Sequence, residues 1–127
     1  MQEKNLYEYA VIRVVPRVER EEFLNVGIIL FCKKAKFIKV IHLLPLAKIL
    51  ALDQEADVEQ IQANIYAFEQ VAHGTKQGGP IAIMDIPSRF RWLTALRSSV
   101  IQTSRPHPGI CDDLDQTVER LFAELVL

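Results

Sequence analysis

YEYAVIRVVPRVEREEFLNVGIILFC, residues 7–32, is the stretch that decides the expected fold. Its first part, residues 7–15, is rich in β-branched and aromatic side chains and stops at Pro16, as a strand does. Its last part, residues 26–33, is almost wholly apolar and predicts a second strand, whereas the RVEREEF segment between them is too charged to be core. Strands that are apolar on both faces must be covered on both faces. We therefore expect helices, or a second copy of the chain, on each side of this pair.

The middle of the chain predicts a hairpin and then helices. A charged turn, KKAK, leads into a third strand over residues 37–44, and strands this close in sequence pair as a hairpin by default. Pro45 opens a short helical turn that runs to residue 52, and a longer helix follows, with Asp53 or Asp57 as its cap and Gly74 as its end. The apolar stripe of this helix is Val58, Ile61, Ile65, Phe68 and Ala72. GTKQGGP, residues 74–80, lacks the glycine spacing of a phosphate-binding loop and is expected to be a connector.

The C-terminal third predicts two more helices around a short strand. Asp85 and Pro87 are typical of a helix start, and residues 100–104 predict a fourth strand. RPHPGICDD, residues 105–113, is expected to be irregular, because prolines and a glycine interrupt it. A last helix should begin at Asp112 or Asp113. The side chains expected to pack inward from these helices are Phe90, Trp92, Leu93, Leu114, Val118, Leu121, Phe122 and Leu125.

Length and composition describe one globular domain. The chain has 127 residues, of which 50% are hydrophobic and 24% charged, and its formal net charge is −1. This balance does not indicate a nucleic-acid or membrane-surface protein. No apolar run approaches the ~20 residues of a membrane helix, and the N-terminus has no signal-peptide layout, so we expect a cytoplasmic protein. The predicted fold class is α+β, a single domain over residues 1–127 with a mostly antiparallel sheet of about four strands and helices packed on it.

Neither cysteine indicates a metal or redox site. Cys32 and Cys111 are too few for a disulfide scaffold, and Cys32 lies in an apolar strand where it is expected to be buried. The chain has no CxxC motif and no His/Cys pair at zinc spacing. We therefore expect no metal ligands and no cofactor.

Polar residues that could form a functional site gather in residues 88–113, with Arg13 in the first strand as an outlying member. Guanidinium groups near hydroxyls suit a carboxylate or a phosphate. A charge within an apolar strand is costly unless it is paired, so Arg13 is expected to meet Asp112 or a ligand. The alternative is that these arginines pair with the protein's own carboxylates or stay in water. The candidate anion-binding or functional cluster is Arg13, Arg91, Arg97, Ser98, Gln102, Ser104, His107 and Asp112.

A catalytic role for this cluster needs a base and a nucleophile. His107 could be a general base, oriented by Asp112 or Asp113, with Ser98 or Ser104 as the nucleophile. Such a loose Ser/His/Asp set is a weak signal, because triads are recognised by geometry rather than by proximity in sequence. The catalytic residues therefore stay unassigned, and the sequence does not commit to an enzyme.

Several motifs, in this order, resemble a bacterial family of unknown function numbered 3037. They are Y-x-Y-x-x-x-R-x-x-P, E-F-x-N-V-G-I, R-F-x-W-L, R-S, Q-T-S and H-x-G-x-C-D-D, and the resemblance covers nearly the whole chain. The family has A-P-R-S where this chain has ALRS (95–98), and S-P-x-H where it has SRPH (104–107). The polar or special residues at matching positions are Arg13, Glu22, Asn25, Gly27, Arg91, Trp92, Arg97, Ser98, Gln102, Ser104, His107, Gly109 and Asp112. The resemblance implies a small bacterial protein with a frequent neighbour related to HipA-like kinases, and it brings no assigned activity to this chain.

These observations lead to a first functional hypothesis and two alternatives. The first is a non-enzymatic interaction module that binds a protein partner, such as a kinase-like one, or another copy of itself through a face of its sheet. The second is an anion or nucleotide-phosphate site, with or without hydrolysis, formed by Arg13, Arg97, Gln102 and His107 with Asp112. The third is nucleic-acid binding through the 89–97 helix, where Arg89, Arg91, Trp92 and Arg97 form a basic and aromatic patch.

Overall fold

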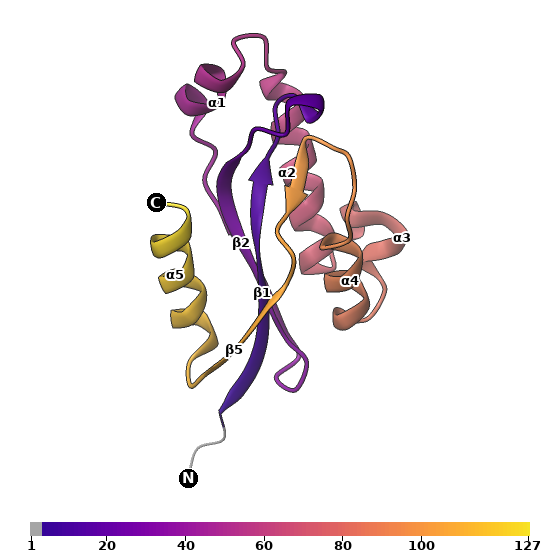
Figure 1. The fold of residues 1–127 in the computed structure, drawn as a ribbon. Coiled ribbons are helices and arrows are strands. Elements are labelled where there is room, and N and C mark those ends of the chain that lie inside the picture. Colours follow the sequence, from indigo (N-terminus) through magenta and orange to yellow (C-terminus); the bar gives the residue numbers. More distant parts are fainter. Residues whose placement is uncertain (1–3) are drawn as a thin grey trace.

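The computed structural model describes residues 4–127 and shows an α+β fold built on an antiparallel sheet (Figure 1). The strand order is β3-β2-β1-β4, and β5 also pairs with β1. The strands are β1 (Asn5–Val14), β2 (Leu24–Cys32), β3 (Phe37–His42), β4 (Ile101–Thr103) and β5 (His107–Cys111). The predicted fold class is confirmed, and the first three strands lie where the sequence placed them, within two residues at most of their ends.

The helices begin at the caps that the sequence indicated. Asp57 accepts a hydrogen bond from the Gln60 N–H at the start of α2, Asp85 accepts from Ser88 at α4, and Asp113 accepts from Gln116 at α5. Gly74 ends α2 in the left-handed conformation, with a φ of 69°. The helices are α1 (Leu46–Leu52), α2 (Val58–His73), α3 (Gly79–Ala82), α4 (Ile86–Leu93) and α5 (Leu114–Leu125), with short 3-10 turns η1 (Val18–Arg20) and η2 (Lys76–Gly78).

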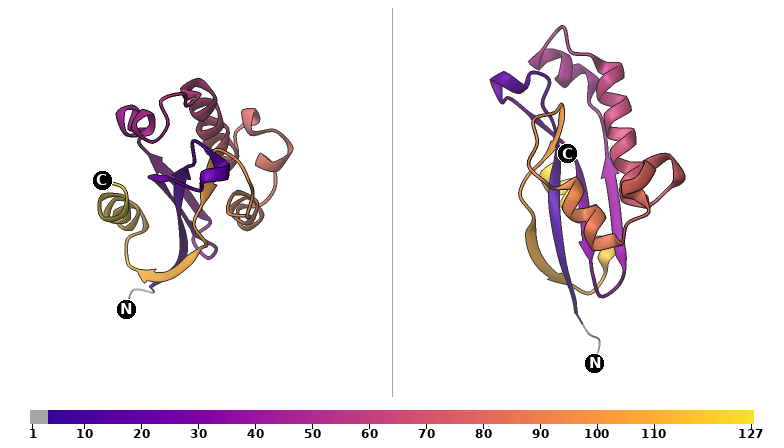
Figure 2. Two further views of the ribbon diagram at one scale, coloured as in Figure 1. Left: turned by 45° about the horizontal axis from the view of Figure 1, so that its top comes forward. Right: turned by 90° about the vertical axis from the view of Figure 1, so that its right-hand side faces the viewer.

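Helices of the same chain cover both faces of the sheet, as the doubly apolar strands require. Helices α2 and α4 lie on one face and α5 lies on the other, so that the sheet is the middle layer (Figures 1 and 2). The larger core packs Ala10, Ile12 and Val14 of β1 against α2 and α4. The smaller core packs Tyr7 and Val11 against α5. Alternate residues of one strand therefore serve two cores, and neither face of the central strands is left for a second copy of the chain.

The segment expected to be irregular contains an edge strand. β5 pairs with residues 5–9 of β1, and Pro108 lies opposite Glu8. The N–H of Val15 and the C=O of Val11 bond across to the β4 side, so the odd-numbered residues of β1 face this edge. Pro108, opposite an even-numbered residue, therefore stands at a position whose nitrogen points away from β1, where a missing N–H breaks no ladder bond. Prolines exclude a central strand but not an edge strand, which explains the error.

Three smaller expectations also need correction. GTKQGGP connects α2 to the helices that follow, as expected, but it folds into η2 and continues into α3. Helix α4 ends at Leu93, so it stops before the end of the predicted 89–97 helix. Trp92 does not pack inward: 41% of its surface is exposed, whereas its neighbours Phe90 and Leu93 are buried. Trp92 is the next-to-last residue of the helix, and only one side of so short a helix faces the core.

Residues 4–127 contain no helix with the length and apolar character needed to cross a membrane.

Candidate functional site

Four of the predicted site residues line one pocket at the β4 edge of the sheet. Arg13 and Gln102 lie directly opposite each other in the β1–β4 ladder, and the loop after α4 brings Arg97 and Ser98 to the same place. The pocket has a volume of about 590 Å³. Its other lining residues include Glu21, Phe23 and Leu96. The anion hypothesis required Arg13, Arg97, Gln102, His107 and Asp112 to converge. The first three meet in this pocket, whereas His107 and Asp112 do not line it.

A bulge in the neighbouring strand sets the position of Arg13. Ile12 pairs with Gly27 but Arg13 pairs with Asn25, so Val26 is an extra residue in β2. The guanidinium carbon of Arg13 lies 4.2 Å from the centre of the Phe23 ring. Its Nε atom is buried without a hydrogen-bond partner, and within residues 4–127 no carboxylate pairs with this arginine. Asp112, which the sequence offered as its partner, pairs instead with Lys4.

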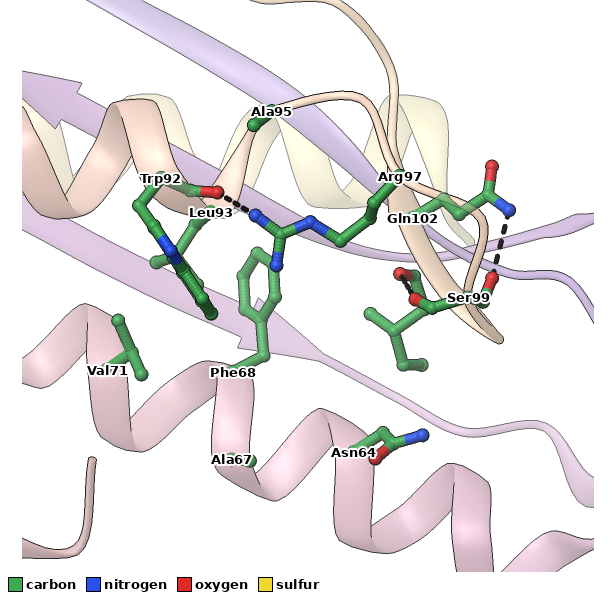
Figure 3. Close-up of a pocket in the computed structure, with 11 residues that line it drawn as sticks. Asn64, Ala67, Phe68, Val71, Trp92, Leu93, Ala95, Arg97, Ser99 and Gln102 are labelled. Atoms are coloured by element: carbon green, nitrogen blue, oxygen red, sulfur yellow. Dashed lines mark hydrogen bonds between the residues drawn. The ribbon is translucent and has the colours of Figure 1, made fainter. Parts of the chain in front are cut away.

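Arg97 is held by an aromatic ring rather than by a carboxylate. Its guanidinium carbon lies 4.2 Å from the centre of the Trp92 ring, and one of its N–H groups donates to the backbone C=O of Trp92 (Figure 3). None of the ion pairs of the described residues includes Arg97. The remaining donors of this guanidinium are therefore available to a ligand.

A second, more apolar hollow adjoins the first and shares Arg97 and Gln102 with it. Figure 3 shows this hollow between α2 and the segment that runs from the end of α4 to β4, with the Arg97 side chain reaching toward Trp92 above Phe68. It has a volume of about 250 Å³. Its polar lining is Asn64, Arg97, Ser99 and Gln102, and its apolar lining is Ala67, Phe68, Val71, Trp92, Leu93, Ala95 and Ile101.

Ser104 is near this edge, but its hydroxyl is used by the fold. The Val11 N–H donates to Ser104 Oγ over 2.9 Å, and the Ser104 N–H donates to the Val11 C=O over 2.9 Å. The hydroxyl in turn donates to the C=O of Arg105 over 3.0 Å. The side chain thus replaces a strand partner at the break between β4 and β5, and it is not placed as a nucleophile in either hollow.

We expect Ser104→Ala to lower the free energy of unfolding by about 1–2 kcal/mol, because the Val11 N–H loses its acceptor in a buried position. Urea unfolding measures this change. Ser98→Ala is the matched control, since Ser98 is exposed, and it should unfold like the wild type. A Ser104→Ala protein as stable as the wild type would show that the hydroxyl does not hold the two strands together.

His107, Asp112 and Arg91 lie away from the pocket. His107 is opposite Tyr9, with its ring 5.4 Å from the Tyr9 ring, and the Asp112 C=O accepts from Asn5. At ~3.3 Å per residue, these places are about 13 Å and 26 Å along β1 from Arg13. The cluster separates because β4 and β5 pair with opposite ends of one long strand. No histidine lines either hollow, so the proposed Ser/His/Asp set does not assemble.

Arg89 and Arg91, the two arginines of α4, make hydrogen bonds within the protein. Arg91 makes two hydrogen bonds to the Glu8 carboxylate, of 3.0 and 2.6 Å, and these raise the pKa of Arg91 above its ordinary value. Arg89 donates to the Ala82 C=O. At the other end of the helix, hydrogen bonds from the Ser88 side chain and N–H lower the pKa of Asp85. Arg97 is not on the helix, so α4 does not present the basic stripe that the nucleic-acid alternative needs.

Sequence reasoning missed two apolar members of this site, Phe23 and Leu96. Phe23 lies under Arg13, and Leu96 is 99% exposed. Leu96 left a signal, because the chain has leucine there and a turn-forming proline is the residue of the resembling pattern. Trp92, which lies beside Arg97, was named with it in the basic and aromatic patch of the nucleic-acid alternative. Within the part of the chain that the structure describes, no group of His, Cys, Asp and Glu side chains could hold a metal ion.

Comparison with known proteins agrees with the resemblance seen in the motifs. No curated protein and no solved structure matches the chain. One family does match, described as "Protein of unknown function (DUF3037)", and its match covers residues 9–126. Since this is nearly the full length, the chain belongs to the DUF3037 family.

Proposed function

We propose that this protein is a binding module that recognises an acidic segment of a partner protein at the β4 edge. The recognition surface is Arg13, Phe23, Trp92, Leu96 and Arg97, named here the arginine–aromatic patch. The observation that carries the proposal is the state of its two arginines. Each is stacked on an aromatic ring, lies in a hollow and has no carboxylate partner among residues 4–127.

Four other arginines provide a contrast, whereas Arg89 and Arg105, like the arginines of the patch, are in no ion pair of the described residues. Arg17 pairs with Asp53, Arg20 with Glu22, Arg91 with Glu8 and Arg120 with Glu124. The 590 Å³ pocket is lined by two guanidinium groups, Arg13 and Arg97, and by one carboxylate, Glu21, so positive charge is in excess there. This local excess of positive charge, in a chain whose formal net charge is −1, favours an anionic partner.

The exposed apolar groups of the patch favour a protein as that partner. Leu96 is 99% exposed, Phe23 45% and Trp92 41%. Aromatic residues and arginine are the residues that contribute most at protein interfaces, and apolar surface gathered in one place marks such a contact. A free phosphate would use the guanidinium groups but would leave these side chains in water. The resemblance points to a kinase-like neighbour as the first partner to try.

We expect Arg97→Glu to weaken binding of the partner at least about thirtyfold, because a central interface arginine contributes about 2 kcal/mol or more. The tagged wild-type chain, cross-linked in its native cells, identifies a partner, and titration with the purified partner gives the affinity. Arg120→Glu is the matched control, since Arg120 lies on α5 and lines neither hollow of the β4 edge.

Binding by the Arg97→Glu and Arg120→Glu variants decides between the possible outcomes. Binding that is lost with Arg97→Glu, kept with Arg120→Glu and weakened by salt supports the proposal. Equal binding by both variants contradicts it. Loss of binding after the partner is treated with a phosphatase would show that the anion on the partner is a phosphate rather than a carboxylate.

A further inference from the structure

We infer that the 250 Å³ hollow beside Arg97 receives one large apolar side chain of the partner, and that Arg97 binds an acidic residue next to it in the partner's sequence. The inference rests on the proposed function and specifies what the patch recognises: a short segment in which a bulky apolar residue neighbours an acid.

The walls of the hollow are suited to a hydrocarbon group. Phe68, Val71 and Leu93 form its deep surface, each less than 10% exposed. Trp92 and Ala67 form the exposed rim. A cavity of ~150 Å³ lined by such side chains holds a benzene molecule, so about 250 Å³ has room for a phenylalanine or leucine side chain but not for a whole nucleotide.

Three of the four polar groups, Arg97, Ser99 and Gln102, come from the segment that runs from the end of α4 through β4, where an acidic neighbour would lie, and the fourth, Asn64, is on α2. The Arg97 guanidinium reaches across the hollow to the Trp92 carbonyl, so its charge is at the apolar surface (Figure 3). Gln102 and Ser99 are already bonded to one another, because the Gln102 amide donates to the Ser99 C=O over 2.9 Å. Arg97 is therefore the group that offers charge to an incoming segment, and Arg13 in the adjoining pocket offers the next.

The hollow can be tested with short peptides, because Trp92 is the only tryptophan and its fluorescence reports on this place alone. The probe is the unlabelled peptide Gly-Ser-Glu-Phe-Asp-Ser-Gly, titrated into the full chain. Two matched peptides replace Phe by Ala, or Glu and Asp by Gln and Asn. We expect the Ala peptide to bind at least about tenfold more weakly, since burying an aromatic ring is then lost. The neutral peptide should also bind more weakly, and its binding should not respond to salt.

A filled hollow provides the matched variant. Ala67→Phe adds a ring at the rim of the hollow, and Ala63→Phe adds the same ring on α2 outside it. Both alanines are exposed, so both variants should fold like the wild type, which circular dichroism checks. We expect Ala67→Phe to lower the affinity of the Phe peptide to that of the Ala peptide. Ala63→Phe should leave the affinity of the Phe peptide unchanged.

Two failures of this experiment have different meanings. If the Phe and Ala peptides bind equally and both are lost with Arg97→Glu, the hollow is not a side-chain pocket, but the arginine–aromatic patch still binds acidic segments. If no acidic peptide changes the Trp92 fluorescence and the cellular partner also binds Arg97→Glu normally, both the inference and the proposed function are wrong.

Discussion

Phe90→Ala should lower the free energy of unfolding by about 3–5 kcal/mol, the cost typical of removing a buried ring and leaving a cavity. Phe90 has no exposed surface, and its ring lies 4.9 Å from that of Phe31 on β2. It is the main attachment of α4 to the sheet together with Leu93, which is 3% exposed. Because unfolding free energies of domains are about 5–15 kcal/mol, this one change removes a large part of the stability.

The same helix offers a control that separates stability from binding. Trp92 lies two residues away and is 41% exposed, so Trp92→Ala should cost much less stability but weaken partner binding. Chemical unfolding of both variants gives the first quantity, and titration with the partner gives the second. If Trp92→Ala destabilised the protein as much as Phe90→Ala, Trp92 would be a core residue, as its sequence position had indicated.

Gly27→Ala is expected to cost about 2–3 kcal/mol by forcing apart two paired strands. A Cβ atom at this position would lie 2.6 Å from the backbone oxygen of Ile41 and 3.0 Å from the Cβ of His42. The backbone oxygen cannot rotate away, so β2 and β3 must separate. His42 would also move, and its ring is bonded to Glu69 on α2, so the strain should reach the helix that lines the hollow.

Urea unfolding measures the stability of Gly27→Ala. The slope of the unfolding free energy against urea concentration should equal that of the wild type if the folded and unfolded states keep their compactness. Gly27 also adjoins the bulge that positions Arg13. The loss of partner binding in the variant should therefore be larger than the loss expected from its unfolded fraction alone. Unchanged stability would mean that the strands adjust to the added methyl group and that the close approach is not needed.

Parts of the candidate site could be predicted from sequence, and particular residues show why. Arg13 stands out in the sequence because a charge in an apolar strand needs an explanation, and Gln102 because it lies among arginines and hydroxyls in residues 88–113; the two are paired in the ladder. Ser104 stands out in the same segment as a possible nucleophile, but its hydroxyl is bonded to the Val11 backbone. Residue chemistry identifies a polar group that must have a partner, whereas only the fold shows whether that partner is internal.

The sequence by itself determined the local elements: the first three strands, the cap Asp85, the stop at Gly74, and two pairs of aspartates, 53 or 57 and 112 or 113, from which the structure selects the caps Asp57 and Asp113. These depend on neighbouring residues, on the alternation of side chains along a strand and on hydrogen bonds within one turn. Only the tertiary structure decided that β4 and β5 pair with opposite ends of β1, which separates Arg13 and Arg97 from His107 and Asp112. Pairing between segments about 90 residues apart depends on how the whole core packs, and no local pattern records it.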